Sequence, residues 1–290
     1  MNMVKPIDLA IVGAQKAGTT SLKYYLGEHP EICSHERIEF RFFVDETEYN
    51  QGYKNIFKKY FSHYNGEPRL VVKNVELMYN PQALKRLKEH NPDVKLVLIL
   101  RNPVDRAYSA WLYELRKGRE KVKSFEEAIC LSDLFSDKSL SEKNSYINRS
   151  LYYKHLNKIF GLFPKEQIKV FLFEEFKKNP LFISKMIFEW VNVDVNFTPK
   201  VKIYNKSAKP RSLLITKLIL TDNHFKRAIK AILPQYITFK LGKLILKINE
   251  KKFVPPPMNP ETRKRLASFF EPYNKQLSSL LQIDLSYWSQ

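Results

Sequence analysis

The chain has 290 residues, of which 44% are hydrophobic and 13% aromatic, so it suits one large α/β domain or two small ones and not a disordered chain. Its apolar runs are far shorter than the ~18 residues of a membrane span, and residues 1–6 lack the apolar core of a signal peptide. We therefore expect a cytoplasmic protein. The two cysteines, Cys33 and Cys130, allow at most one disulfide and no cysteine-based metal cluster.

The formal net charge is +19, and it is unevenly distributed. Segment 200–252 contains 14 lysines and arginines against two acids, a net charge of +12. A basic excess of this size predicts an anionic partner, and charge alone leaves nucleic acid, anionic lipid and anionic glycan open.

The N-terminal stretch predicts a phosphate-binding loop. A short apolar run from Ile7 is typical of a buried strand, the chain then turns through Gly13 and Gly18, and 21–28 is the first predicted helix. Backbone N–H groups of such a turn and the positive end of the helix dipole favour an anion. Side-chain donors come from Lys16, Thr19 and Thr20.

The spacing of this loop differs from that of a P-loop NTPase. Gly13 and Gly18 are correctly separated, but Thr19 occupies the lysine position and the lysine has moved to Lys16. The later strand predicted at 95–100 is followed by Arg101 and not by the acid that would hold Mg²⁺. We therefore expect a phosphate site without a metal, as in sulfuryl transfer.

Two motifs carry a family resemblance. Gln15-Lys16-Ala17-Gly18-Thr19-Thr20-Ser21-Leu22 resembles the 5′-phosphosulfate loop of sulfotransferases that use 3′-phosphoadenosine 5′-phosphosulfate (PAPS). About 85 residues later, Leu100-Arg101-Asn102-Pro103-Val104-Asp105-Arg106-Ala107-Tyr108-Ser109-Ala110-Trp111 resembles their 3′-phosphate segment. The chain resembles the bacterial sulfotransferases and the heparan sulfate N-sulfotransferase domain more than the small-molecule cytosolic enzymes.

The resemblance implies PAPS as sulfuryl donor, adenosine 3′,5′-bisphosphate (PAP) as product, and no metal. Lys16 would stabilise the departing phosphate, and Arg101 and Ser109 would hold the 3′-phosphate. The loop ligands of the 5′-phosphosulfate would be Gln15, Lys16, Ala17, Gly18, Thr19, Thr20 and Ser21.

Glu39 is the candidate general base. It lies in an aromatic stretch before Phe42 and Phe43, and an apolar setting raises a carboxyl pKa toward the useful range. The family has a glutamate before a Phe-Phe pair at this place, which deprotonates the acceptor. A surface ion pair of Glu39 with a neighbouring arginine is the alternative. His35 is a reserve candidate for the base.

Further site residues rest on the same resemblance. Lys73 ends the strand predicted at 70–72, where the family places a lysine facing the transferred group. Tyr152 opens a helix that lies by the nucleotide in relatives. Lys251 or Lys252 would belong to a basic loop that closes over it.

The predicted fold is a three-layer α/β domain over residues 1–290, with a parallel sheet of about five strands and P-loop NTPase-like topology. Basic helices at 213–233 and 236–248 would form a lid within 200–252 or meet anionic lipid headgroups at the inner membrane face. The last helix is predicted at 260–281.

The predicted function is sulfuryl transfer from PAPS to a hydroxyl or amine, with a glycan or lipid-linked sugar as acceptor. One alternative is a small-molecule kinase with an atypical phosphate loop, which would need ATP and Mg²⁺. The other is a nucleic-acid-binding protein that uses segment 200–252. No recognition motif supports the latter, so we do not expect nucleic acid as a partner.

Overall fold

The computed structural model describes residues 4–130, 145–200 and 256–289, and positions 208–210, 212, 215, 219, 238, 241–242, 244–245 and 248–252 between the last two ranges. The predicted helix at 213–233 therefore lies almost entirely outside the described residues, and the one at 236–248 is described at only some positions. No helix within the described ranges is long and apolar enough to cross a bilayer.

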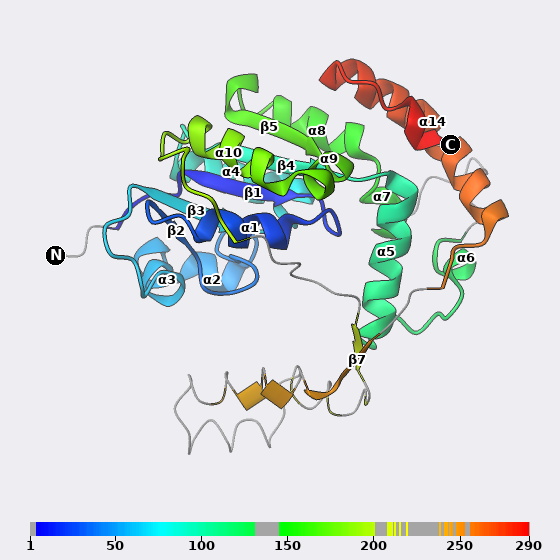
Figure 1. The fold of residues 1–290 in the computed structure, drawn as a ribbon, viewed down its shortest axis with the longest axis horizontal. Coiled ribbons are helices and arrows are strands. Elements are labelled where there is room, and N and C mark those ends of the chain that lie inside the picture. Colours follow the sequence, from blue (N-terminus) through cyan, green and yellow to red (C-terminus); the bar gives the residue numbers. More distant parts are fainter. Residues whose placement is uncertain are drawn as a thin grey trace.

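Five parallel strands form the central sheet in the order β2-β3-β1-β4-β5, as Figure 1 shows. Apolar residues make the inner strands buried on both sides, as expected of a parallel sheet covered by helices. The strands are β1 (Leu9–Gly13), β2 (Ile32–Ser34), β3 (Arg69–Lys73), β4 (Lys95–Leu100) and β5 (Ile168–Leu172).

Helices cover both faces of this sheet, and their positions follow from right-handed crossovers between parallel strands. Helix α1 (Thr19–Gly27) contacts α10 (Pro180–Trp190), whereas α4 (Pro81–His90) contacts α8 (Tyr152–Phe160). The predicted three-layer α/β architecture is thus confirmed. The remaining short elements are α2 (Glu46–Asn50), α3 (Tyr53–Tyr60), η1 (Leu77–Tyr79), η2 (Lys165–Gln167) and α9 (Phe173–Lys178).

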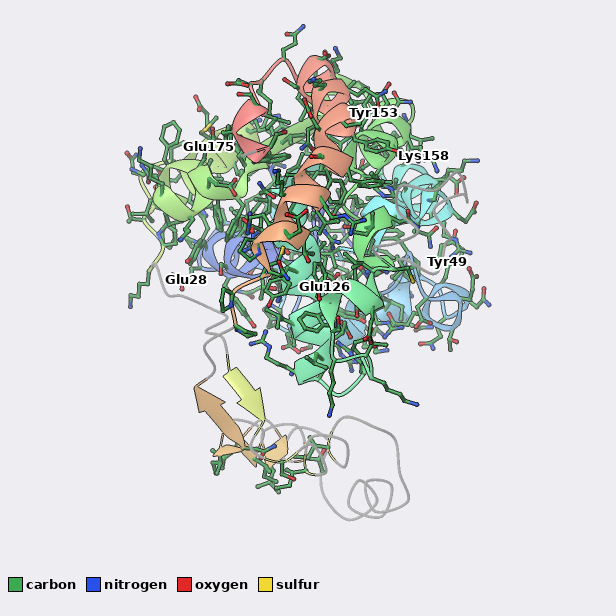
Figure 2. The ribbon with its side chains drawn as sticks, turned by 90° about the vertical axis from the view of Figure 1, so that its right-hand side faces the viewer. Glu28, Tyr49, Glu126, Tyr153, Lys158 and Glu175 are labelled. Atoms are coloured by element: carbon green, nitrogen blue, oxygen red, sulfur yellow. The ribbon has the colours of Figure 1, made fainter. Side chains whose placement is uncertain are left out.

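Beyond the sheet, α5 (Pro103–Arg116) packs with α6 (Phe125–Ala128) and α7 (Ser145–Asn148) around a second apolar cluster. The long helix α14 (Pro260–Leu281) joins the two cores. Its Leu266 and Phe270 pack in the second cluster, and its Leu277 packs in the sheet core. In Figure 2, Glu126 of α6 marks one end of α14 and Tyr153 of α8 lies near the other. Helix α14 therefore fixes α5 relative to the sheet.

Most predicted elements are confirmed, and some boundaries are corrected. The strand at 95–100 and the helix at 260–281 are found as predicted. The edge strand β2 was not predicted, because at three residues it is too short to show an alternating pattern. Helix α1 begins at Thr19, two residues before the predicted start, because Gly18 adopts the left-handed conformation that ends the loop.

A second, two-stranded antiparallel sheet pairs β6 (Ala208–Pro210) with β7 (Glu250–Lys252). Figure 1 shows β7 below the end of α5, away from the main sheet. The pairing brings the two ends of the basic segment together. Lys251 and Lys252 belong to β7, but their side chains are outside the described part of the chain.

Candidate functional site

The loop between β1 and α1 has the geometry of an anion cradle. Gly18 has a φ of 85°, in the left-handed region that favours glycine, and a Cβ atom there would lie 3.0 Å from the ring of Phe176. Both the backbone conformation and the close contact therefore favour glycine at this position. No described side chain caps the first turn of α1, and that turn contains no acidic residue. Its N–H groups therefore point toward the loop with the positive end of the helix dipole.

The two predicted phosphate motifs meet at the carboxyl edge of the sheet. Strands β1 and β4 are neighbours, and the Arg101 guanidinium donates a hydrogen bond of 3.2 Å to the carbonyl of Lys16. The same guanidinium lies 5.0 Å from the centre of the Phe173 ring. Lys16 and Arg101 are thus close enough to contact one bound nucleotide. Ser109 lies on α5, half-buried, two turns after the helix start.

The ammonium of Lys16 lies over an aromatic ring. Its Nζ is 4.3 Å from the centre of the Tyr113 ring, on the helix that also carries Ser109. Burial, with the charges of Arg116 and Arg101, lowers the pKa of Lys16 to about 8. A lysine with this pKa carries a charge that depends on pH in the physiological range, and an anionic ligand would favour its protonated form.

Glu39 forms an ion pair with the buried lysine at the end of β3. Lys73, only 2% exposed, donates a hydrogen bond of 2.5 Å to Oε1 of Glu39 and one of 3.3 Å to the carbonyl of Ile38. Burial raises the pKa of Glu39 even though the charge of Lys73 opposes the shift. A carboxylate with a raised pKa and a fixed orientation is suited to accept a proton.

Two buried side chains hold the segment that carries Glu39. The Lys23 ammonium of α1 donates a hydrogen bond of 2.7 Å to the carbonyl of Arg37, and burial lowers its pKa to about 8. His35 accepts a hydrogen bond of 3.1 Å at Nε2 from the backbone N–H of Lys73, and burial moves its pKa well below the usual value. The acceptor nitrogen of the buried His35 ring is thus occupied by a backbone hydrogen bond, which favours a structural role for His35 over the reserve role as base.

A cleft of about 570 Å³ opens above Glu39. Gln15 from the loop and Glu39 line it together, and the other walls come from the β3–η1 connection, α5 and α7. Glycosyl or similar groups can enter a cleft of this volume beside the phosphate loop. The remaining lining residues are Arg41, Val75, Glu76, Tyr113, Glu114, Arg119, Glu120, Tyr146 and Arg149.

Some predicted site residues lie outside the cleft. Tyr152 is buried, and its hydroxyl donates a hydrogen bond of 2.9 Å to the carbonyl of Arg101, so it supports Arg101 from the interior. Ala17 and Thr19 are buried and offer the loop their backbone, whereas Thr20 and Ser21 are half-buried. Within the described ranges, no group of three or more His, Cys, Asp or Glu side chains is placed to hold a metal ion.

Sequence reasoning missed Tyr113, which contacts Lys16 and lines the cleft. A signal for it exists, since Tyr113 follows Ser109 by four residues and shares its face of α5. It also missed the pairing of Arg149 with Glu76, at 2.9 and 2.7 Å, which closes one wall of the cleft. No local pattern links these two residues.

Three comparisons bear on this site. A family model described as the sulfotransferase domain matches residues 6–211. The chain is similar to a bifunctional heparan sulfate N-deacetylase/N-sulfotransferase 1 of Caenorhabditis briggsae, with 29% identity over 64% of this chain and 22% of that protein. It is also similar to human heparan sulfate glucosamine 3-O-sulfotransferase 5, with 25% identity over 67% of this chain and 55% of that protein.

The chain thus spans well under two thirds of the length of these relatives. A solved sulfotransferase from Alicyclobacillus acidocaldarius has a similar fold, with a TM-score of 0.69 and 25% identity over 99% of this chain and 100% of that chain. The family match covers the phosphate loop, Glu39 and the Arg101 segment together. By this match the chain belongs to the sulfotransferase family.

Proposed function

We propose that this sulfotransferase moves a sulfuryl group from PAPS to a hydroxyl or amine of a glycan acceptor. The observation that carries the proposal is the meeting of two basic elements at one sheet edge, where the Arg101 guanidinium reaches the Lys16 carbonyl. A doubly phosphorylated nucleotide needs one basic site at each end. The names of the relatives, which act on heparan sulfate, support a glycan.

We assign the roles of the residues from the family resemblance, and their positions are compatible with it. The loop N–H groups and the hydroxyl of Thr20 would hold the 5′-phosphate, and Arg101 with Ser109 would hold the 3′-phosphate. Gln15 lies between the loop and the cleft, where it would orient the sulfuryl group. Lys251 or Lys252 would close over the nucleotide.

The transfer is an in-line substitution at sulfur. The acceptor oxygen or nitrogen forms a bond to sulfur while the bond from sulfur to the 5′-phosphate oxygen breaks, and PAP departs. Glu39 takes the acceptor proton, and Lys16 stabilises the charge that develops on the departing phosphate. The hydrogen bond from Lys73 orients the Glu39 carboxylate, and its positive charge compensates the carboxylate until Glu39 takes up the proton.

The base assignment is tested with Glu39→Gln, which keeps the shape of the side chain. We expect transfer of labelled sulfate from PAPS to fall by about 10²- to 10⁴-fold, the usual contribution of a general base, while PAP affinity stays unchanged. Glu36→Gln is the matched control, because Glu36 lies on the same segment with a side chain 52% exposed and should retain full activity. Unchanged turnover in Glu39→Gln would remove Glu39 from the mechanism.

The donor assignment is tested separately by thermal shift with PAP and with ATP and Mg²⁺. If PAP raises the melting temperature and a metal chelator does not change this effect, PAPS is supported as the donor. Stabilisation by ATP and Mg²⁺ alone would indicate a kinase instead.

A further inference from the structure

The arginines that line the cleft are already paired within the chain. The Arg149 guanidinium donates two hydrogen bonds, of 2.9 and 2.7 Å, to the carboxylate of Glu76. Arg119 forms an ion pair of 2.6 Å with Glu114. None of these four side chains needs an external charge, so neither arginine offers a free fork to a sulfate or carboxylate of an acceptor.

The third lining arginine is also paired. Arg41 forms an ion pair of 2.9 Å with Asp45, and its side chain is 61% exposed, so it lies at the rim where water screens its charge. The cleft thus presents no uncompensated arginine among its described lining residues.

The carboxylates of the cleft outnumber its arginines. Four glutamates line it against three arginines, and one of the glutamates, Glu39, is compensated by the buried Lys73. Glu120 accepts hydrogen bonds from the Tyr146 hydroxyl, at 2.9 Å, and from the backbone N–H of Val122, at 2.8 Å. Although burial opposes ionisation, these hydrogen bonds hold the pKa of Glu120 below its usual value, so its charge persists at neutral pH. The described walls are therefore neutral to acidic on a chain whose net charge is +19.

We infer that the cleft takes an uncharged or amine-bearing saccharide as acceptor and disfavours a polyanionic chain. This inference rests on the proposed function. An acidic saccharide would either separate an arginine from its glutamate or bring its own charge beside the carboxylate of Glu120, and both cost free energy. Hydroxyl and ammonium groups can instead donate hydrogen bonds to these carboxylates, and the rings of Tyr113 and Tyr146 add apolar surface for a sugar.

The test uses the full chain, PAPS, and three tetrasaccharides of similar size. They are N-acetylated chitotetraose, which is neutral, chitotetraose, which carries amines, and a heparosan tetrasaccharide, which carries carboxylates. Labelled sulfate transfer measures kcat/KM for each. We expect the neutral or the amine-bearing sugar to exceed the acidic one by at least about tenfold. An equal or higher value for the acidic sugar, or transfer to none of the three, overturns the inference.

A variant connects this preference to the paired arginines. Glu76→Gln frees Arg149, so the ratio of kcat/KM for the acidic sugar to that for the neutral sugar should rise by about fivefold or more. The ratio cancels any general effect on turnover. Glu46→Gln is the control, because it breaks a similar pair with Arg86, at 2.8 Å, outside the cleft and should leave the ratio unchanged. An unchanged ratio in Glu76→Gln contradicts the inference.

PAP binding is measured first for each protein. A wild-type chain that binds no PAP contradicts the proposed donor. A chain that binds PAP and fails the sugar ranking contradicts only the acceptor inference.

Discussion

At the residue scale, the loop lysine has an unusual environment for a solvent-reachable cation. Lys16 is half-buried over Tyr113 and lies near Arg101 and Arg116, and these surroundings lower its pKa to about 8. One of the like charges that lower the pKa, that of Arg101, is expected to contact the 3′-phosphate of the donor. An anionic nucleotide therefore relieves the repulsion and restores the charge of Lys16.

Binding of PAP should consequently depend on pH. Because the protonated form of Lys16 binds the anion, and the free protein loses this proton as the pH rises through about 8, affinity should weaken by up to about tenfold between pH 7 and pH 9. Isothermal titration calorimetry with PAP measures the effect. In Lys16→Arg the positive charge persists across this pH range, so PAP affinity should no longer depend on pH between pH 7 and pH 9. Lys23 has a similar pKa, and a dependence that survives in Lys16→Arg would assign it to Lys23.

At the element scale, four helices of the described chain begin with the same dipeptide. In α4, α5, α10 and α14 an asparagine is the N-cap and a proline is the first helical residue. The asparagine side chain accepts a hydrogen bond from a free N–H of the first turn, and proline has no N–H to satisfy there. This is why the start of the last helix, α14, could be predicted so closely from the sequence.

The cap of α5 has an additional function. Asn102 accepts hydrogen bonds from the N–H groups of Val104 and Asp105 and donates one of 3.1 Å to the carbonyl of Trp288. Asn102→Ala should therefore reduce the free energy of unfolding by about 2–3 kcal/mol, since both the cap and the buried bond are lost. Asn80→Ala in α4, which loses a cap alone, should cost about 1 kcal/mol. Urea denaturation measures both, and equal losses would contradict the role of the Trp288 contact.

At the scale of the whole molecule, the C-terminal residues pack against the segment that contains Arg101. Trp288, in η3 (Ser286–Ser289), is 1% exposed and packs 6.1 Å from the ring of Tyr152. Tyr152 in turn supports the carbonyl of Arg101. The C-terminal tail and α14 thus stabilise the edge of the sheet that carries the site.

Removal of this tryptophan should destabilise the entire fold. Trp288→Ala is expected to lower the free energy of unfolding by about 3–5 kcal/mol, the usual cost of emptying a large core position. Tyr287→Ala is the adjacent control, because Tyr287 is 39% exposed and should cost less than about 1 kcal/mol. Chemical denaturation followed by tryptophan-independent far-UV circular dichroism distinguishes the two. Similar small losses would show that the tail is dispensable.

The sequence by itself determined the phosphate loop, the strand that ends before Arg101, and the last helix. These features depend on local patterns, namely apolar runs, Gly18 at a left-handed position and Asn-Pro caps, which act between neighbouring residues. The motif resemblance placed Glu39 and Lys16 among the candidates, and their roles in transfer stay predictions.

Only the tertiary structure decided which side chains meet. The pairs Glu39 with Lys73, Lys16 with Tyr113 and Arg149 with Glu76 join residues that are distant in the chain, and the strand order and the packing of α5 bring them together. The edge strand β2 and the inward position of Tyr152 were likewise set by their neighbours in space. Sequence periodicity shows which face of an element is apolar, but it contains no information on the partner that covers that face.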